Sequence, residues 1–133
     1  MKLAAAIACL ASAASAANLT IEVSGLRSSQ GTVHVAIYDR PEAFPKSDGM
    51  LNEITVPITG KLATALFSGL TPSRYAVAVY HDENGNNEFD QGLFGIPLED
   101  FAFSNGARAF FGPPSFSDAA IDLGPNGGRI RIP

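Results

Sequence analysis

The stretch Gly69-Leu70-Thr71-Pro72-Ser73-Arg74-Tyr75-Ala76-Val77-Ala78-Val79-Tyr80 decides the fold of this chain. Its second half alternates Tyr75, Val77 and Val79 with residues for an opposite face, which is the period of a β-strand. Its first half holds a glycine and a proline, which mark a tight connection. β-Sandwich domains often place a tyrosine at such a strand start, where its hydroxyl bonds back to the backbone upstream. The stretch therefore predicts a central strand entered through a tyrosine corner, with an ordinary buried aromatic residue as the alternative.

The same alternation recurs along the chain and predicts further short strands, separated by glycine and proline turn signals. No amphipathic helix of convincing length is present. The seven expected strands cover residues 19–23, 33–37, 54–58, 62–67, 75–80, 119–123 and 129–132. This pattern favours an all-β domain, an antiparallel β-sandwich of about seven strands, immunoglobulin-like or transthyretin-like.

A long phenylalanine-rich segment interrupts the strand pattern. Residues 89–116 hold seven of the nine phenylalanines, together with several glycines and prolines. A long loop in a compact domain is usually functional or disordered, and so many apolar rings argue against disorder. We expect the segment to fold over one end of the sandwich as a satellite hydrophobic cluster. A second loop, residues 39–52, is expected at the surface with Phe44 tucked in.

The first residues resemble an export signal. Met1-Lys2 gives a positive start, Leu3 to Leu10 is apolar, and Ala14-Ser15-Ala16 matches a small-residue cleavage site. We expect a signal peptide over residues 1–16, a single domain over residues 17–133, and a periplasmic or extracellular location. The apolar run is too short to span a membrane. Cys9 would be removed with the signal, so the mature chain would have no disulfide.

The charge balance limits the classes of partner. The chain has 9 Lys and Arg side chains against 13 Asp and Glu, a formal net charge of −4. This balance argues against nucleic acid and against an anionic membrane surface, because both attract basic patches. We expect a monomer whose partner, if it has one, is a surface glycan or a protein.

An acidic stretch after the central strand suggests a metal site. Oxygen-bearing side chains fall at every second position, at Asp82, Asn84, Asn86, Glu88 and Asp90. Calcium takes several oxygen ligands from a loop that curls round one point. The stretch therefore predicts a site for Ca²⁺, and the expected function is a non-enzymatic module that this ion stabilises.

The stretch departs in two places from the twelve-residue calcium loop. Asn87 stands where that loop has glycine, although asparagine tolerates a left-handed conformation. Leu93 stands where the loop has its bidentate glutamate, which Glu99 or Asp100 could replace by folding back. The alternative is a solvated acidic turn with Asn84-Gly85 at a hairpin corner.

Two other functions remain open. A carbohydrate- or peptide-binding domain could use the surface of residues 100–116, although sugar platforms usually expose Trp or Tyr and this chain has no Trp. A small hydrolase around His81 would need Asp82 and a serine such as Ser104 or Ser115 beside it, and no G-x-S-x-G motif is present. The alternation also predicts that His34 faces away from the core and that His81 lies on the core side of its own strand, so that the two rings point to opposite faces.

The ordered motifs 31–39, 68–86, 95–99, 103–105 and 111–116 resemble the bacterial family of domain of unknown function 2141. The likeness covers essentially the whole of the expected mature chain. It implies an exported single-domain protein and assigns no activity. Family sequences usually carry glycine where this chain has Ser73 and Asn87. The turn-tyrosine-strand pattern is also similar, more distantly, to transthyretin-like and collagen-adhesin modules, which implies a fold and no function.

Overall fold

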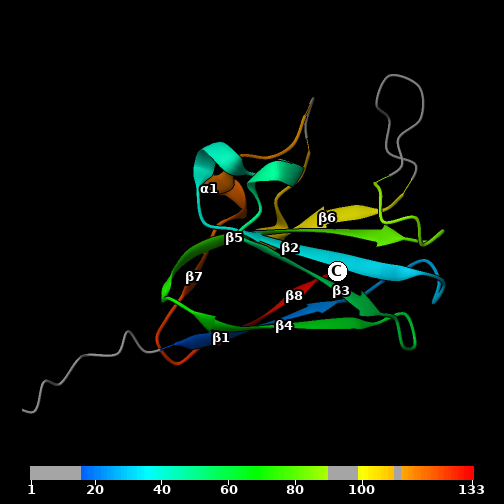
Figure 1. Cartoon of the computed structure of the whole chain (residues 1–133), viewed down its shortest axis with the longest axis horizontal. Coiled ribbons are helices and arrows are strands. Elements are labelled where there is room, and N and C mark those ends of the chain that lie inside the picture. The colour runs from blue at the N-terminus through cyan, green and yellow to red at the C-terminus, as the bar shows by residue number, and fades with distance from the viewer. Residues whose placement is uncertain (1–15, 90–98, 110–111) are drawn as a thin grey trace, which may run out of the picture.

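The chain folds as a β-sandwich, as the sequence predicts. The computed structural model describes residues 16–89, 99–109 and 112–133, and their strands form two sheets packed face to face (Figure 1). Residues 1–15 of the expected signal peptide and the predicted ligand Asp90 lie outside the described residues.

The described residues form eight strands, one short α-helix, α1 (Phe116–Ala119), and three 3-10 helices, η1 (Pro41–Ala43), η2 (Ser47–Gly49) and η4 (Ser104–Gly106). The strands are β1 (Ala17–Val23), β2 (Thr32–Tyr38), β3 (Asn52–Pro57), β4 (Ala63–Leu70), β5 (Ser73–Asp82), β6 (Phe101–Phe103), β7 (Ile121–Leu123) and β8 (Gly128–Ile132). Seven of them correspond to predicted strands. The eighth, β6, is too short to show an alternation. Within the described residues, no helix has the length and apolar character needed to cross a bilayer.

The sheets differ in one pairing from a wholly antiparallel sandwich. Sheet A has the order β4-β1-β8, and sheet B has the order β3-β2-β5-β6, with β7 also paired to β5. All pairs are antiparallel except β1 and β8, which run parallel. A parallel pair needs a long connection, and here the chain between the first and last strands provides it.

The main core lies between the two sheets. Alternate residues of β1, β2, β4 and β5 point inward, which places the predicted apolar positions there. The most deeply buried members include Leu19, Ile21, Val33, Val35, Ile37 and Val77. Full burial of one such side chain stabilises the fold by about 1.5–3 kcal/mol, so this core is the chief source of stability.

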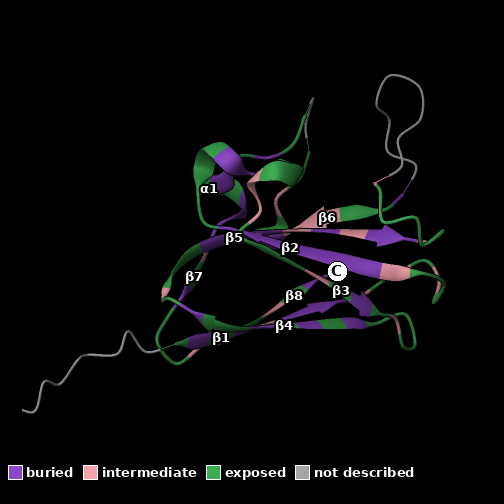
Figure 2. Cartoon of the chain, viewed as in Figure 1, coloured by how far each residue is buried: buried purple, intermediate pink, exposed green. Residues whose placement is uncertain are grey.

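Strands β2 and β5 are buried on both faces, as Figure 2 shows. On the side away from sheet A they carry Ala36, Tyr38 and Ala76, which pack in a second apolar cluster with Phe44 and Phe116. The sequence predicts this satellite cluster and the buried Phe44. The predicted position is wrong, because the cluster covers the outer face of sheet B and not one end of the sandwich.

The tyrosine corner is confirmed. The Tyr75 hydroxyl donates a hydrogen bond of 2.5 Å to the Thr71 carbonyl, four residues upstream. The ring is buried in the core between the sheets. The bond therefore fixes the connection from β4 into β5.

Ser104 bridges a gap in the strand pairing of sheet B. Strand β5 pairs with β7 through Tyr75 and with β6 from Ala78 onward, which leaves a gap between the two partners. The fully buried Ser104 hydroxyl fills this gap: it accepts a 2.8 Å hydrogen bond from the Val77 amide and donates one of 2.5 Å to the Ala119 carbonyl. One side chain thus holds β5, α1 and the end of β6 together.

We predict that Ser104→Ala lowers the free energy of unfolding by about 1–3 kcal/mol, because it leaves a buried amide and a buried carbonyl without this partner. Urea denaturation measures the change. The matched control, Ser68→Ala, removes an exposed hydroxyl from β4 and should change stability by less than about 0.5 kcal/mol. Equal effects of the two substitutions would contradict this role for Ser104.

Candidate functional site

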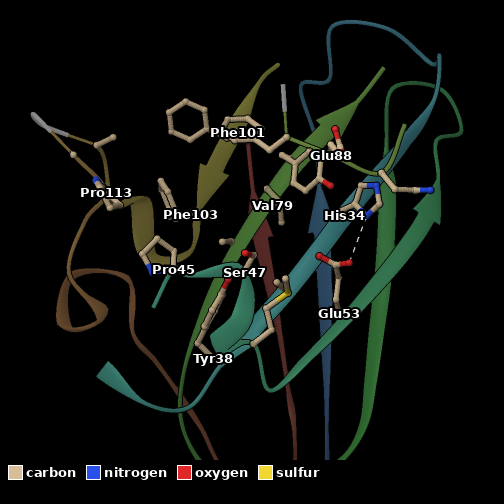
Figure 3. A pocket seen from close by; sticks show the side chains of 18 residues that line it. His34, Tyr38, Pro45, Ser47, Glu53, Val79, Glu88, Phe101, Phe103 and Pro113 are labelled. Carbon is tan, nitrogen blue, oxygen red and sulfur yellow. Dashed lines mark ion pairs between the residues drawn. The ribbon is translucent and has the colours of Figure 1, made fainter. Parts of the chain in front are cut away.

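A groove lies on the outer face of sheet B, beside the second apolar cluster. Its volume is ≈ 860 Å³. Strands β2, β3, β5 and β6 supply one part of its lining, and the loops around residues 45–50, 87–89, 109 and 112–113 supply the rest (Figure 3). Strands therefore hold much of the lining in place.

Aromatic rings form a continuous series along the groove. Tyr80 contacts Phe89 with ring centroids 5.4 Å apart, and Phe89 contacts Phe101 at 5.7 Å. Phe101 then contacts Phe103, which contacts Phe44 of the second apolar cluster. Phe101 remains 39 % exposed. The series thus runs from the buried cluster to a ring that solvent can reach.

His34 is the buried polar side chain of the groove. The period of β2 turns its ring to the outer face, where it stacks on Tyr80 with centroids 4.5 Å apart and planes 10° apart. Its Nε2 lies 3.0 Å from Asp82 Oδ2, and its Nδ1 lies 3.0 Å from Thr55 Oγ1. The Nδ1 atom also lies 3.7 Å from Glu53 Oε1 (Figure 3). An ionised Asp82 requires a proton on Nε2, so in neutral His34 the Nδ1 atom accepts from the Thr55 hydroxyl.

Asp82 is a fully buried carboxylate at the end of β5. Besides His34, it accepts hydrogen bonds from the backbone amides of Asn87 at 2.8 Å and Asn86 at 3.2 Å. Burial alone would raise the pKa of Asp82, but the hydrogen bond from His34 and those from the two amides outweigh burial and lower it. The carboxylate therefore stays charged and ties the loop after β5 to strand β2.

Three other predicted calcium ligands, Asn84, Asn86 and Glu88, are exposed in that loop. Asn84 Oδ1 accepts from the Asn86 amide at 3.2 Å, and Asn86 Oδ1 accepts from the Glu88 amide at 3.0 Å. Asn87 has φ of 62°, the left-handed conformation that the sequence allows for it. The loop is therefore curled on itself, with Asp82 at its base.

The structure places the described predicted ligands, Asp82, Asn84, Asn86 and Glu88, in one loop without bringing their charged groups together. Among the described residues, no three His, Asp or Glu side chains come close enough to hold a metal ion. Glu99 does fold back, but its carboxylate accepts from the Glu83 amide at 3.1 Å, and Asp100 pairs with Arg27 at 2.8 Å. Ion binding by Asp82, Asn84, Asn86 and Glu88 stays a prediction.

The residues of the suggested hydrolase lie apart. His81 points into the sandwich, where Nε2 lies 2.7 Å from the Gln30 carbonyl, while Asp82 points to the other face of β5. Ser104 bridges strands, and Ser115 caps α1 by accepting from the Asp118 amide. The two histidines face opposite sides of sheet B, as the alternation predicts.

Sequence reasoning missed the contacts that His34 makes with Asp82 and with Glu53. The alternation already placed His34 on an outer face, and the same period places Tyr80 and Asp82 together on one face. The alternation within one strand could not show that β2 and β5 are neighbouring strands, with His34 opposite Tyr80.

The fold and the groove define a small β-sandwich domain with a preformed hollow on one outer face. The chain belongs to the bacterial family described as "Uncharacterized protein conserved in bacteria (DUF2141)", whose sequence profile matches residues 21–131. No curated protein and no solved structure matches the chain.

We predict that Asp82→Asn lowers the free energy of unfolding at neutral pH by about 2 kcal/mol, because charged hydrogen bonds are lost in a buried place. The folded pKa lies below the usual 3.8, so the charged form stabilises the fold above that pH. This contribution disappears as the pH falls through the folded pKa.

Urea denaturation between neutral pH and about pH 2 tests this prediction. The difference between Asp82→Asn and the wild type should shrink towards the acid end. Asp122→Asn is the matched control, because Asp122 is exposed and its only ion pair among the described residues is a 3.4 Å contact with Arg74. A difference for Asp82→Asn that is constant with pH would show that its charge does not stabilise the fold.

Proposed function

We propose that this protein is a non-enzymatic binding module that takes a small, largely apolar ligand into the groove on the outer face of sheet B. The observation that carries the proposal is the groove itself. Its ≈ 860 Å³ falls in the range of about 300–1,000 Å³ that is usual for small-molecule sites.

The character of the lining supports this class of ligand. Ala36, Met50, Ala78, Phe101 and Phe103 make much of it apolar, and Glu53 and Glu88 add a few polar groups. Ligand sites commonly combine a mostly apolar wall with a small number of polar groups that fix orientation.

The segment around residues 100–116 contributes Phe101, Phe103, Ala109 and Pro113 to the groove. This supports the earlier alternative of binding through that surface. The rings are phenylalanines without polar handles, which suits an apolar body better than a glycan.

A binding role without catalysis is supported by how the candidate hydrolase residues are used. His81 and Ser104 are buried and bonded within the fold, away from the groove lining. We also propose, from the signal-like residues 1–16, that the module works outside the cytoplasm.

Binding of a neutral fluorescent probe, N-phenylnaphthylamine, tests the proposal. Its fluorescence should rise with the wild-type protein. Ala78→Leu should weaken binding by roughly tenfold or more, because the longer side chain fills the groove floor.

Thr64→Leu is the control, since it adds a similar apolar side chain to an exposed position on β4 of the other sheet. It should leave probe binding unchanged. No fluorescence increase, or equal binding by the wild type and Ala78→Leu, would refute the groove as a ligand site.

Calcium binding in the loop of residues 82–90 is a second proposal. The observation that favours it is that Asp82 accepts the Asn86 and Asn87 amides while Asn87 is left-handed, which curls the loop as ion binding would need. The ion would stabilise the folded state by about 2.7 kcal/mol at a hundredfold excess over Kd.

Thermal unfolding in calcium and in excess chelator tests this second proposal. We expect calcium to raise the Tm by roughly 10 °C. Asn84→Ala and Asp90→Ala should abolish the rise. Glu88→Gln should keep it. With Asp82 as the first position of the twelve-residue calcium loop, Glu88 is the seventh, which binds the ion through its backbone carbonyl. Identical curves with calcium and with chelator would exclude the site.

A further inference from the structure

We propose that the groove selects ligands that carry a positive charge beside an apolar body, that is, organic amines. This inference rests on the proposed function and narrows it to one chemical class. It depends on the charges that line the groove and on the rings next to them.

The groove carries negative charge without a matching lysine or arginine. Among the described lining residues, Glu53 comes from β3 and Glu88 from the loop after β5, and His34 is the one basic side chain. Arg27 is engaged elsewhere, with Glu83 and Asp100. The described lining therefore offers two carboxylates and no lysine or arginine to pair with them.

His34 offers these carboxylates no positive charge when it is neutral. Its Nε2 proton belongs to the bond with Asp82, and its Nδ1 faces Thr55 at 3.0 Å, closer than Glu53 at 3.7 Å. The Glu53 side chain is 35 % exposed, so a ligand can reach it. An ammonium group at this position would meet a carboxylate that no arginine or lysine of the described chain pairs with.

The aromatic series favours the same charge. Tyr80 and Phe89 are tilted by 57°, and Phe89 and Phe101 by 76°, and all three of these rings belong to the lining of the groove. The face of an aromatic ring attracts a cation. The rings would thus hold both the apolar body and the charged end of an amine.

The charge also counts against other amphipathic ligands. A carboxylate ligand, such as a fatty acid, would face Glu53 and Glu88 and the overall charge of −4. A neutral alcohol would gain neither ionic nor cation–π attraction. The expected order of affinity is therefore amine, then alcohol, then carboxylate.

Three ligands that share a phenylalkyl chain and differ in their terminal group test this order of affinity: phenylbutylamine, phenylbutanol and phenylbutyrate. Their competition with N-phenylnaphthylamine gives their relative affinities for the purified protein. We expect the amine to bind about tenfold more tightly than the alcohol, from one or two partly exposed ionic contacts and a cation–π contact. Added salt should reduce this ratio.

The double variant Glu53→Gln, Glu88→Gln removes both carboxylates from exposed side chains, so folding should persist. It should bring the affinity for the amine down to that for the alcohol and leave the alcohol unchanged. Glu42→Gln, an exposed acid outside the groove, is the control and should keep the preference.

The outcomes separate this inference from the proposed function. If the alcohol binds as tightly as the amine, or if the double variant keeps the preference, the charge selection is wrong while the groove remains a ligand site. If none of the three ligands competes and the probe does not bind either, the proposed function fails as well.

Discussion

Burial of the central strands of sheet B on both faces is the constraint that organises the rest of this structure. A sheet in a sandwich commonly leaves one face to solvent, and sheet A does so: the exposed Arg129 and Arg131 lie on its outer face and bond to Glu22. Strands β2 and β5 instead place alanines and Tyr38 outward, and these require a cover. The described parts of the two long loops provide it, with Phe44 and Phe116 over one part of the sheet. The groove lies beside this second layer, over the same strands.

Asp82, the last residue of β5, connects the loop that follows this strand to sheet B. A fully buried carboxylate is costly unless several donors surround it, and here they come from His34 and from two amides of the following loop. The same loop brings Glu88 and Phe89 to the groove. The position of the groove wall therefore depends on a charge that does not itself line the groove. At the far end of the groove, burial and then the carboxylates of Glu53 and Asp48 raise the pKa of the Tyr38 phenol to about 12.

The alternation of side chains was enough to predict seven strands, the tyrosine corner and the opposite orientations of His34 and His81, because each depends on local geometry. The pairing of strands was not predictable in this way. The parallel contact of β1 with β8 joins residues from the two ends of the domain, and β6 exists because Ser104 and β5 hold three residues in place. The acidic loop was found from its spacing alone. Its base at Asp82 turned out to be tied to a histidine 48 positions earlier, a contact that no local pattern encodes.

The parallel pairing of β1 and β8 has a mechanical consequence. Because the first and last strands are neighbours that run in the same direction, the chain enters sheet A at one end and leaves it at the opposite end. A pulling force between the two termini then acts along both strands. Their five residue pairs, from Leu19 with Gly128 to Val23 with Ile132, are loaded together and must slide past one another at once, whereas a hairpin pulled from its open end separates pair by pair.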